Sequence, residues 1–290
     1  MAQILTGKEV AAAINDRSRK TVEKLRKEGI TPTLAILRVG ERADDLSYER
    51  GAVKRCEEVG ITVRKVTLPE DVTSDIFFGA LTELNEDPSV HGILMFRPLP
   101  AQIDNEKARL SIAPEKDIDG CTDGSLTGVF TGRPIGFAPC TAQAVIEILD
   151  YYGIDIAGKK AVVLGRSLVV GKPVSMLLLN RNATVTVCHT KTKDDPAEAR
   201  EADILVACTG KMEKVGAEYA REGQVVIDVG ISWNEAKGKL CGDCRFEELE
   251  PLVSAITPVP GGVGAVTTSV LVSHVAEAAE RFASAQASKR

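Results

Sequence analysis

The order of apolar and polar positions along the chain predicts strands that alternate with helices. Short apolar runs, several of them ended by glycine or proline, precede stretches in which apolar residues recur at helical spacing. We expect helices over 6–28, 45–59, 73–86 and 141–152, and a final alanine-rich helix over 267–286. We expect strands over 34–39, 61–68, 90–96, 160–164, 183–188, 203–208 and 225–230.

This alternation is typical of an α/β protein. Strands connected by helices form right-handed parallel β–α–β units, and the strands of the second half would form a doubly wound sheet. The chain has 290 residues, which is enough for two domains with cores of their own. The sequence therefore predicts parallel sheets whose ligands bind at the carboxyl ends of the strands.

The first candidate site lies where the strand over 160–164 ends. Gly165 ends the apolar run, and Gly171 opens the next helical stretch. Free N–H groups and the positive end of a helix dipole bind anions at such a turn, and Arg166 and Ser167 add a charge and a hydroxyl. The glycine spacing differs from the G-x-G-x-x-G fingerprint of dinucleotide sites. An ordinary strand-to-helix turn with a surface arginine is therefore the alternative.

A second turn bears on the kind of dinucleotide. The strand over 183–188 is followed by His189, Thr190 and Lys191, and no carboxylate appears until Asp194. A carboxylate at this turn usually holds the ribose hydroxyls of NAD, whereas the 2′-phosphate of NADP needs donors. The turn therefore favours NADP, although some NAD enzymes also lack the acid. Taken alone, His189 could equally be a structural or solvent-facing histidine.

Two later segments also follow strands. The strand over 225–230 leads to Ile231, where backbone groups could meet a nicotinamide carboxamide. The segment 257–264 holds two prolines and three glycines, which fix a turn and let a ligand approach bare backbone. A plain loop is the alternative for this segment.

Charge and cysteine content limit the partners and the location. The net charge of −5 and the isoelectric point near 5.5 argue against nucleic acid or an anionic membrane as the main partner. No apolar run is long enough to span a membrane, and no secretory signal is visible. Seven scattered cysteines fit reduced thiols in the cytoplasm. We expect no metal, because Cys241 and Cys244 form a C-x-x-C without a second pair at zinc spacing, although Cys188-His189 could in principle complete it.

In this order, the segments resemble the methylenetetrahydrofolate dehydrogenase/cyclohydrolase family. The matching pieces are 116–120, 139–141, 165–167 with 170–171, 183–189, 227–231, 242–243 and 257–264. The resemblance implies a folate-binding catalytic domain over 1–140 and a Rossmann-type NAD(P)-binding domain over 141–266, with a cleft between them. The helix over 267–290 could pack back on the first domain. The resemblance also implies a homodimer.

The resemblance further implies which residues hold the ligands. NADP, or less often NAD, would bind at Gly165, Arg166, Ser167, His189, Thr190 and Ile231. The catalytic and folate-binding residues would be Tyr48 and Asp119, and the loop Pro260, Gly261 and Gly262 would also contact the folate. A carboxylate can accept both donors of the pterin's amino-pyrimidinone edge, which gives Asp119 a physical role. Without the family, Asp119 would be taken for a solvated turn residue.

Two departures from the family concern proton transfer. The family's helix carries a tyrosine and, four residues later, a lysine that assists proton transfer, whereas Tyr48 is here followed by Ala52. The family's glutamine after the third strand is replaced by Phe96. Lys54 lies about 200° around the helix from Ala52, so it cannot simply substitute. Arg55 shares the face of Tyr48, but an arginine hardly ever releases a proton.

These departures predict that the two activities of the family are affected differently. Taking hydride from a methylene bridge needs alignment but no protein base, whereas hydrolysis of a methenyl cation needs added water and moved protons. We expect a dehydrogenase of one-carbon folate metabolism with little or no cyclohydrolase activity, beside a separate cyclohydrolase in the cell. The alternatives are a bifunctional enzyme in which Arg55, Lys54 or water takes over, and a nucleotide sensor without turnover. A zinc-held interaction module built on Cys241 and Cys244 is a third.

Overall fold

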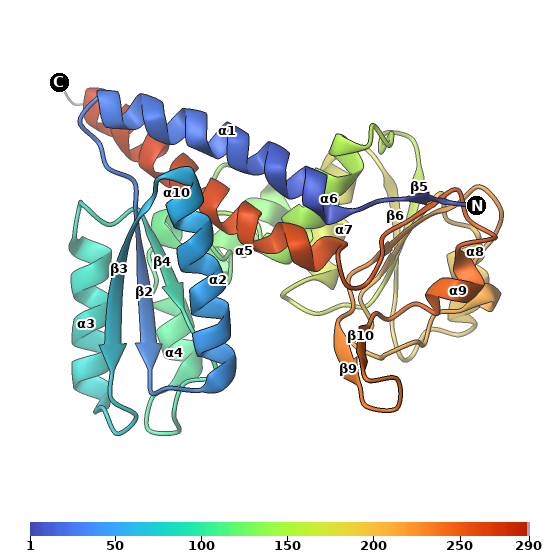
Figure 1. Ribbon diagram of the computed structural model, residues 1–290, viewed down its shortest axis with the longest axis horizontal. Helices are drawn as coiled ribbons and strands as arrows, with labels where there is room; N and C mark the ends of the chain where they lie inside the picture. The colour runs from blue at the N-terminus through green and yellow to red at the C-terminus, as the bar shows by residue number, and fades with distance from the viewer. Residues whose placement is uncertain (289–290) are drawn as a thin grey trace. The chain divides into compact units, whose positions relative to one another are not determined.

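The computed structural model describes residues 1–288, which divide into two compact units. One unit comprises residues 1–12 and 141–267, and the other comprises 13–140 and the segment from Thr268 onward. Each unit has its own parallel sheet with helices packed on it (Figure 1). The α/β fold with two parts, predicted from the alternation of strands and helices, is confirmed. Within residues 1–288, no helix is both long and apolar enough to cross a membrane.

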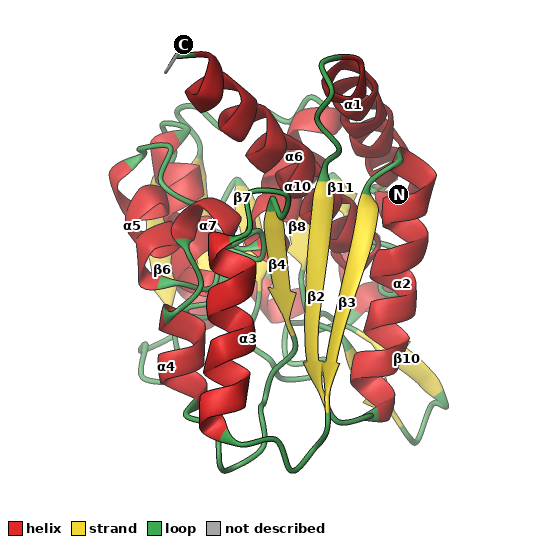
Figure 2. Cartoon of the chain, turned by 90° about the vertical axis from the view of Figure 1, so that its left-hand side faces the viewer, coloured by secondary structure: helices red, strands yellow, loops and turns green. Residues whose placement is uncertain are grey.

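The unit of residues 13–140 is built on a three-stranded parallel sheet with the order β3-β2-β4. The strands are β2 (Thr33–Val39), β3 (Thr62–Leu68) and β4 (Gly92–Met95). Their carboxyl ends lie at the same edge of the sheet (Figure 2). The central strand β2 is buried from Leu34 onward, which explains its continuous apolar run.

The helices of this unit begin and end at residues with ordinary capping chemistry. They are α1 (Gly7–Lys27), whose first turns belong to the other unit, α2 (Ala43–Val59), α3 (Ser74–Glu86), α4 (Asn105–Leu110), the 3₁₀ turn η1 (Pro114–Lys116), α5 (Asp123–Thr131) and most of α10 (Val263–Ala287). The Thr73 side chain accepts the N–H of Ile76 at the start of α3. Gly60 ends α2 in the left-handed conformation, with φ of 85°. The last two residues of the helix expected over 267–290 lie outside the described residues.

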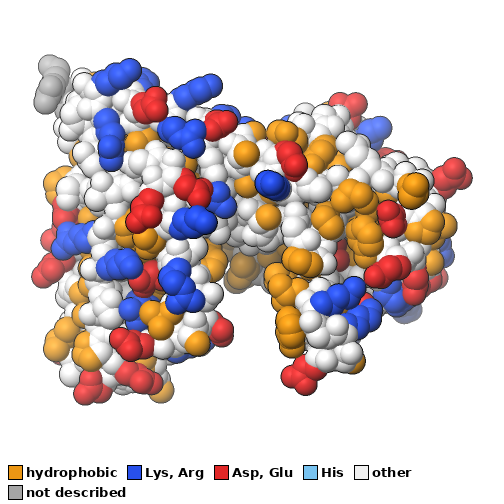
Figure 3. All heavy atoms as spheres, viewed as in Figure 1, with side chains coloured by type: hydrophobic (Ala, Val, Ile, Leu, Met, Phe, Trp, Pro, Cys, Tyr) orange, Lys and Arg blue, Asp and Glu red, His pale blue; other side chains and the backbone are white. Residues whose placement is uncertain are grey.

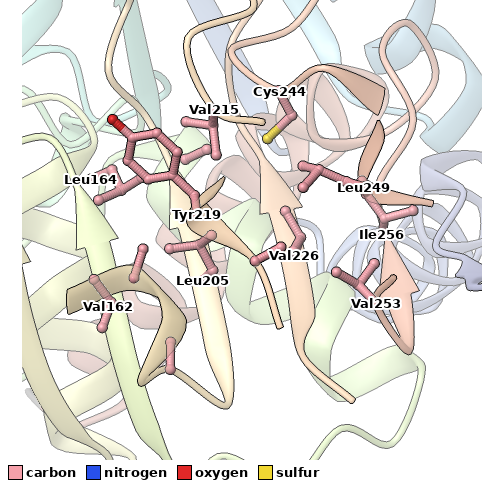
Figure 4. Close-up of a cluster of buried hydrophobic side chains, with 14 of the residues drawn as sticks. Val162, Leu164, Leu205, Val215, Tyr219, Val226, Cys244, Leu249, Val253 and Ile256 are labelled. Carbon is pink, nitrogen blue, oxygen red and sulfur yellow. The ribbon is translucent and has the colours of Figure 1, made fainter. Parts of the chain in front are cut away.

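The second unit contains a six-stranded parallel sheet with the order β1-β11-β8-β7-β5-β6. The strands are β1 (Gln3–Ile4), β11 (Ala255–Ile256), β8 (Val225–Asp228), β7 (Ile204–Ala207), β5 (Lys160–Leu164) and β6 (Thr184–Cys188). β6 lies on one side of β5 and β7 on the other, so the strand order reverses at β5. Ligands of open α/β sheets bind at such a reversal. Figure 4 shows the apolar side chains of this unit that pack around Leu205 and Val226.

Several elements of the second unit were not predicted from the sequence. A hairpin is formed by β9 (Ser232–Asn234) and β10 (Lys239–Cys241), and the strand expected over 225–230 ends at Asp228. β1 pairs with β11, so residues 1–12 belong with 141–267. Two helices of this unit agree with the prediction, namely α6 (Cys140–Tyr151), expected over 141–152, and α7 (Gly171–Asn180), expected to begin at Gly171. The remaining helical elements are α8 (Asp195–Arg200), α9 (Phe246–Leu249) and the 3₁₀ turn η2 (Ala217–Tyr219).

A buried ion pair joins α2 to the sheet of its unit. Arg38 Nε of β2 lies 2.9 Å from Glu49 Oε2 of α2, and the two side chains are only 8% and 7% exposed. Lys65 Nζ of β3 lies 2.8 Å from the other oxygen of Glu49. Burial acts to raise the pKa of Glu49, but the hydrogen bonds from Lys65 and Arg38 hold it below its ordinary value. The pair therefore fixes α2 one residue away from Tyr48.

We expect Arg38→Met to lower the free energy of unfolding by about 3 kcal/mol, because it leaves the buried Glu49 carboxylate without one of its two partners. Arg64→Met is the matched control, since Arg64 pairs with Asp87 near the surface, and exposed pairs contribute less than about 1 kcal/mol. Urea unfolding followed by circular dichroism measures both. Equal shifts for the two variants would contradict the stabilising role of the buried pair.

Candidate active site

Three residues singled out in the sequence meet in the unit of residues 13–140. The rings of Tyr48 on α2 and Phe96 after β4 make an edge-to-face contact, with centroids 5.8 Å apart and planes at 83°. Burial raises the pKa of Tyr48 well above its usual range, and the nearby Asp119 carboxylate raises it further. Tyr48 therefore stays protonated at neutral pH and can donate a hydrogen bond.

The surroundings of the Asp119 carboxyl group bring its pKa close to neutral pH. Burial raises the pKa of Asp119 to about 6, and the charge of Asp117 adds to this, while Arg97 and a hydrogen bond with Cys140 lower it. At neutral pH the group is mostly ionised and acts as an acceptor. Burial, together with the Asp119 charge, raises the pKa of the Cys140 thiol, so Cys140 is a neutral neighbour and not a nucleophile.

The turn that presents Asp119 is organised by its neighbours. The buried Asp117 carboxylate accepts the N–H of Cys121 at 3.0 Å and that of Thr122 at 2.7 Å. Gly120 has φ of 69°, and a Cβ atom there would lie 2.4 Å from the nitrogen of Pro139. Asp117 and Gly120 therefore have structural roles within this motif, which leaves Asp119 as the carboxylate available to a ligand.

The positions that depart from the family are apolar in the structure. Ala52 is completely buried and Phe96 is 8% exposed. Arg55 is paired with Glu58 at 2.8 Å, one turn further along α2, and Lys54 is exposed. The side chain of Tyr48 interacts with Phe96, Asp119, Cys140 and Thr268.

The dinucleotide site expected in the second unit corresponds to a cavity. It has a volume of about 210 Å³ and lies at the carboxyl ends of β5, β6 and β7. Five of the residues expected to bind the cofactor line it, namely Gly165, Arg166, Ser167, His189 and Thr190. The sixth, Ile231, follows β8 and is 59% exposed, but it does not line this cavity. Arg166 is exposed and forms no ion pair within residues 1–288, so its charge is available to a phosphate.

The glycines of the first turn are required by close backbone contacts. Gly165 has φ of 136°, and a Cβ atom there would lie 2.2 Å from the carbonyl oxygen of Cys208. A Cβ atom at Gly171 would lie 2.4 Å from the carbonyl oxygen of Gly165. The wide glycine spacing, which differs from the usual fingerprint, therefore still brings the turn and α7 into backbone contact.

One expectation for this turn was wrong. The N–H groups at the start of α7 were expected to be free for an anion, but Ser167 accepts them. Its hydroxyl accepts the N–H of Val170 at 3.1 Å and that of Gly171 at 3.4 Å, and its carbonyl accepts the N–H of Lys172 at 3.0 Å. Pro173 has no N–H to offer. The helix therefore supplies few free donors, and the Arg166 side chain is the main positive group of the turn.

His189 has a structural contact as well as a place in the cavity wall. Its Nδ1 accepts the N–H of Lys191 at 3.1 Å, and its own N–H donates to Thr192 Oγ1 at 2.9 Å. These bonds fix the turn after β6 and leave Nε2 as the ring nitrogen that can face a ligand. His189 can therefore have a structural role through Nδ1 and bind a ligand through Nε2, so the geometry is compatible with both interpretations that the sequence left open.

The proline- and glycine-rich loop packs against the start of the chain. The carbonyl oxygen of Gly261 accepts the N–H of Gly7 at 2.7 Å, and Gly261 has φ of 101°. A Cβ atom at Gly262 would lie 2.4 Å from the carbonyl oxygen of Pro258. Pro260 is exposed. The glycines of this loop are therefore needed for the fold itself, whatever they contribute to a ligand.

Two polar groups near these sites were not recognised from the sequence. The buried Asp228 carboxylate accepts the N–H groups of Gly230, Asp243 and Cys244, and burial raises its pKa to about 6. A Cβ atom at Gly242 would lie 1.9 Å from Asp228 Oδ2, so the Gly242-Asp243 motif was a signal for this contact. The second is the ion pair between Asp195 and Lys214, which lies in the wall of the cavity. Their 19-residue separation gave no sequence signal.

Comparison with known families identifies the chain. Its residues 5–119 match the catalytic domain, and its residues 139–283 the NAD(P)-binding domain, of tetrahydrofolate dehydrogenase/cyclohydrolase. The chain belongs to the tetrahydrofolate dehydrogenase/cyclohydrolase family. The cavity at the ends of β5, β6 and β7 lies within its NAD(P)-binding domain.

Individual relatives agree with this family. The bifunctional protein FolD of Carboxydothermus hydrogenoformans is 52% identical over 281 residues, which cover 97% of this chain and 98% of that protein. The structure of the bifunctional enzyme FolD from Campylobacter jejuni is similar with a TM-score of 0.92 and 38% identity, covering 97% of this chain and 99% of that one. The Trypanosoma brucei methylenetetrahydrofolate dehydrogenase-cyclohydrolase, solved with NADP and an inhibitor, has a TM-score of 0.87 and 36% identity, covering 97% and 98%.

We expect the affinity of this family member for a tetrahydrofolate ligand to fall as the pH drops through about 6, because protonation of Asp119 removes an acceptor. Well below that pH the loss approaches about tenfold per pH unit. Equilibrium titrations between about pH 5 and 8 measure it.

The variants Asp119→Asn and Arg97→Leu are the controls for this titration. Asp119→Asn should bind weakly at every pH, and any slope that it keeps belongs to the ligand. Arg97→Leu should move the midpoint to higher pH, because Arg97 lowers the pKa of Asp119. A wild-type affinity with the same pH dependence as Asp119→Asn would contradict the role of this carboxylate.

Proposed function

We propose that this chain oxidises 5,10-methylenetetrahydrofolate to 5,10-methenyltetrahydrofolate by hydride transfer to NADP, and that its cyclohydrolase activity is weak or absent. The observation that supports the second part is the apolar pair Ala52 and Phe96 beside Tyr48, where the family resemblance implies lysine and glutamine. The catalytic residues under this proposal are Tyr48 and Asp119.

The substrate would be held by hydrogen bonds to fixed polar groups. Asp119 would accept the donors of the pterin's amino-pyrimidinone edge, which a carboxylate can do with both oxygens. The protonated Tyr48 would donate to the folate from α2 and cover it with its ring. Pro260, Gly261 and Gly262 would contact the folate through bare backbone. These contacts would orient the methylene bridge, and orientation is the main requirement of the hydride step.

The residues in the cavity of the NAD(P)-binding domain fit NADP. Arg166 offers an exposed guanidinium, and Thr190 and His189 offer donors at the turn after β6, while the Asp195 carboxylate that also lines this cavity is paired with Lys214. Gly165 would shape the turn at which the phosphates bind, because it lets the Cys208 carbonyl pack against it, and Ile231 would lie on the nicotinamide side. Bound NADP supplies the hydride acceptor for the reaction.

The cyclohydrolase step makes demands that this site does not meet. Water must add to the methenyl carbon, and protons must move to and from the folate nitrogens. Positioned acid and base groups contribute about 10² to 10⁴ to the rate of such steps. Ala52 and Phe96 offer neither a proton nor a hydrogen bond, and the high pKa of Tyr48 makes it a poor base.

A bifunctional enzyme is the second candidate, and the names of the relatives favour it. The proteins from Carboxydothermus hydrogenoformans and Clostridioides difficile, 52% and 51% identical to this chain, are both named bifunctional protein FolD. In this chain, Lys54 or Arg55 would then have to take over the proton transfer. The exposure of Lys54 and the pairing of Arg55 with Glu58 weigh against both. A nucleotide sensor without turnover is the weakest alternative, because Tyr48 and Asp119 are retained.

We expect Ala52→Lys combined with Phe96→Gln to raise the cyclohydrolase rate at least about tenfold, because the pair restores a proton carrier and a hydrogen-bonding side chain. Hydrolysis of added methenyltetrahydrofolate, corrected for the buffer rate, measures it. Lys54→Ala and Arg55→Ala should leave that rate unchanged. If either alanine variant abolished a substantial wild-type rate, the bifunctional alternative would be correct.

We also propose a homodimer, as the family resemblance implies. The hairpin of β9 and β10 carries hydrophobic side chains on its surface (Figure 3), and Trp233 there is 60% exposed. Large exposed apolar side chains on one surface are typical of interfaces. We expect a dimer in sedimentation experiments and a monomer for Trp233→Glu. Phe130→Glu, which changes an aromatic residue of α5 that is 72% exposed, should stay dimeric. A monomeric wild type would contradict the proposal.

In the cell, the product of such an enzyme would need a hydrolase. We propose that a separate cyclohydrolase consumes the methenyltetrahydrofolate that this chain forms. The test deletes the gene for this chain, supplies either the wild type or the doubly substituted variant, and then removes the second enzyme from each strain. The wild type should depend on the second enzyme for growth without exogenous purines, and the variant should depend on it less.

A further inference from the structure

An ion pair that the proposed function does not use lies in the wall of the dinucleotide cavity. Lys214 Nζ lies 2.6 Å from Asp195 Oδ2, and both residues line the cavity. The hydroxyl of Tyr219 donates to the same oxygen at 3.3 Å. The pair is partly shielded, because the side chains of Lys214 and Asp195 are 30% and 20% exposed.

The pair is anchored in the core of its unit. Tyr219 is 5% exposed and packs in the same cluster as Leu164 and Val215, with its hydroxyl directed away from the ring's apolar neighbours (Figure 4). The ammonium group of Lys214 lies 5.5 Å from the centroid of the Tyr219 ring. A side chain held from two directions keeps its position when a ligand enters, which is a requirement for selecting between similar ligands.

The charges and free atoms of the pair suit a polar ligand. Within residues 1–288, the hydrogen bonds that the Asp195 carboxylate accepts from Lys214 and Tyr219 both end on Oδ2, so Oδ1 can accept a further hydrogen bond. Burial acts to lower the pKa of Lys214, but hydrogen bonds with Asp195 and Tyr219 raise it overall. Lys214 therefore stays charged at neutral pH and keeps N–H groups to donate. The wall presents an acceptor and a donor side by side.

The position of the pair indicates which half of the dinucleotide it would face. In doubly wound sheets, the adenosine ribose binds at the end of the strand that follows the phosphate turn, which is β6 here. The cavity is lined by His189 and Thr190 after β6 and by Thr209 after β7. It therefore corresponds to the adenosine half, and the purine ring is the part of NADP that would reach Asp195 and Lys214.

Adenine matches this wall through its hydrogen-bonding edge. Its exocyclic amino group donates, and the adjacent ring nitrogen accepts. We propose that Asp195 and Lys214 select the purine of the cofactor, with Asp195 accepting from the amino group and Lys214 donating to the ring nitrogen. This inference rests on the proposed binding of NADP. Hypoxanthine reverses both positions, because its six-position oxygen accepts and its adjacent nitrogen carries the hydrogen, so that the carboxylate would face an oxygen.

The test compares two cofactors that differ only at this edge. Isothermal titration of the purified protein with NADP and with nicotinamide hypoxanthine dinucleotide phosphate gives both dissociation constants without turnover. We expect wild type to bind NADP at least about tenfold more tightly. Asp195→Asn should reduce this preference to about twofold or less, since an amide can turn to donate to the oxygen. Lys214→Met should reduce it as well.

Controls separate selection from stability and from phosphate binding. Lys160→Met removes an ion pair with Glu201 elsewhere in the unit and should keep the full preference. Arg166→Ala should weaken NADP more than NAD but keep the preference for adenine. Thermal unfolding verifies that each variant is folded. Equal binding of both cofactors by wild type would contradict selection by this pair, and so would a full preference kept by Asp195→Asn. Neither result would contradict the binding of NADP. If wild type bound neither cofactor, the proposed function would fail with it.

Discussion

The close backbone contact at Gly165 is the constraint on which the NAD(P)-binding domain depends. The N–H of Gly165 donates to the carbonyl of Cys188 at 2.9 Å, and the missing side chain lets the carbonyl of Cys208 approach from the other side. Gly165 therefore joins the ends of β6 and β7 at the point where the strand order reverses. Gly171 repeats the constraint by bringing α7 against the same turn. The cavity exists because these three strand ends are held together without a side chain between them.

The catalytic domain shows the opposite situation, in which side chains decide the chemistry. Tyr48 and Asp119 remain in place, and the buried pair of Arg38 and Glu49 fixes the helix that carries Tyr48. The positions that would move protons hold Ala52 and Phe96, and Phe96 packs against the ring of Tyr48. Under the proposed function, Tyr48 and Asp119 would still orient a folate, while apolar side chains occupy the positions where the family resemblance implies groups that activate water. This difference between orientation and proton transfer is the physical basis of the proposed dehydrogenase.

Much of the fold could be predicted because hydrophobic patterns are local. The strands over 160–164 and 34–39 and the helix over 45–59 agree with β5, β2 and α2 to within two residues, and five of the proposed cofactor residues line one cavity. The sequence could not indicate that Ser167 caps α7, since a serine after a glycine turn is also a common ligand for phosphate. Nor could it reveal the pairing of Asp195 with Lys214, and the Gly242-Asp243 motif was only an indirect signal for the contact of Asp228 with the backbone around Asp243. These contacts join residues far apart in the chain, and only the packing of the strands brings them together.

Under the proposed function, the chain makes methenyltetrahydrofolate and releases it without hydrolysing it. The most direct measurement follows both steps in one reaction, with purified wild-type protein, 5,10-methylenetetrahydrofolate and NADP. The absorbance of NADPH and that of methenyltetrahydrofolate are recorded together over the whole time course. We expect the two products to appear in equal amounts and the methenyl compound then to decay at the rate in buffer alone. A methenyl signal that never accumulates, because hydrolysis keeps pace with NADPH formation, would contradict it.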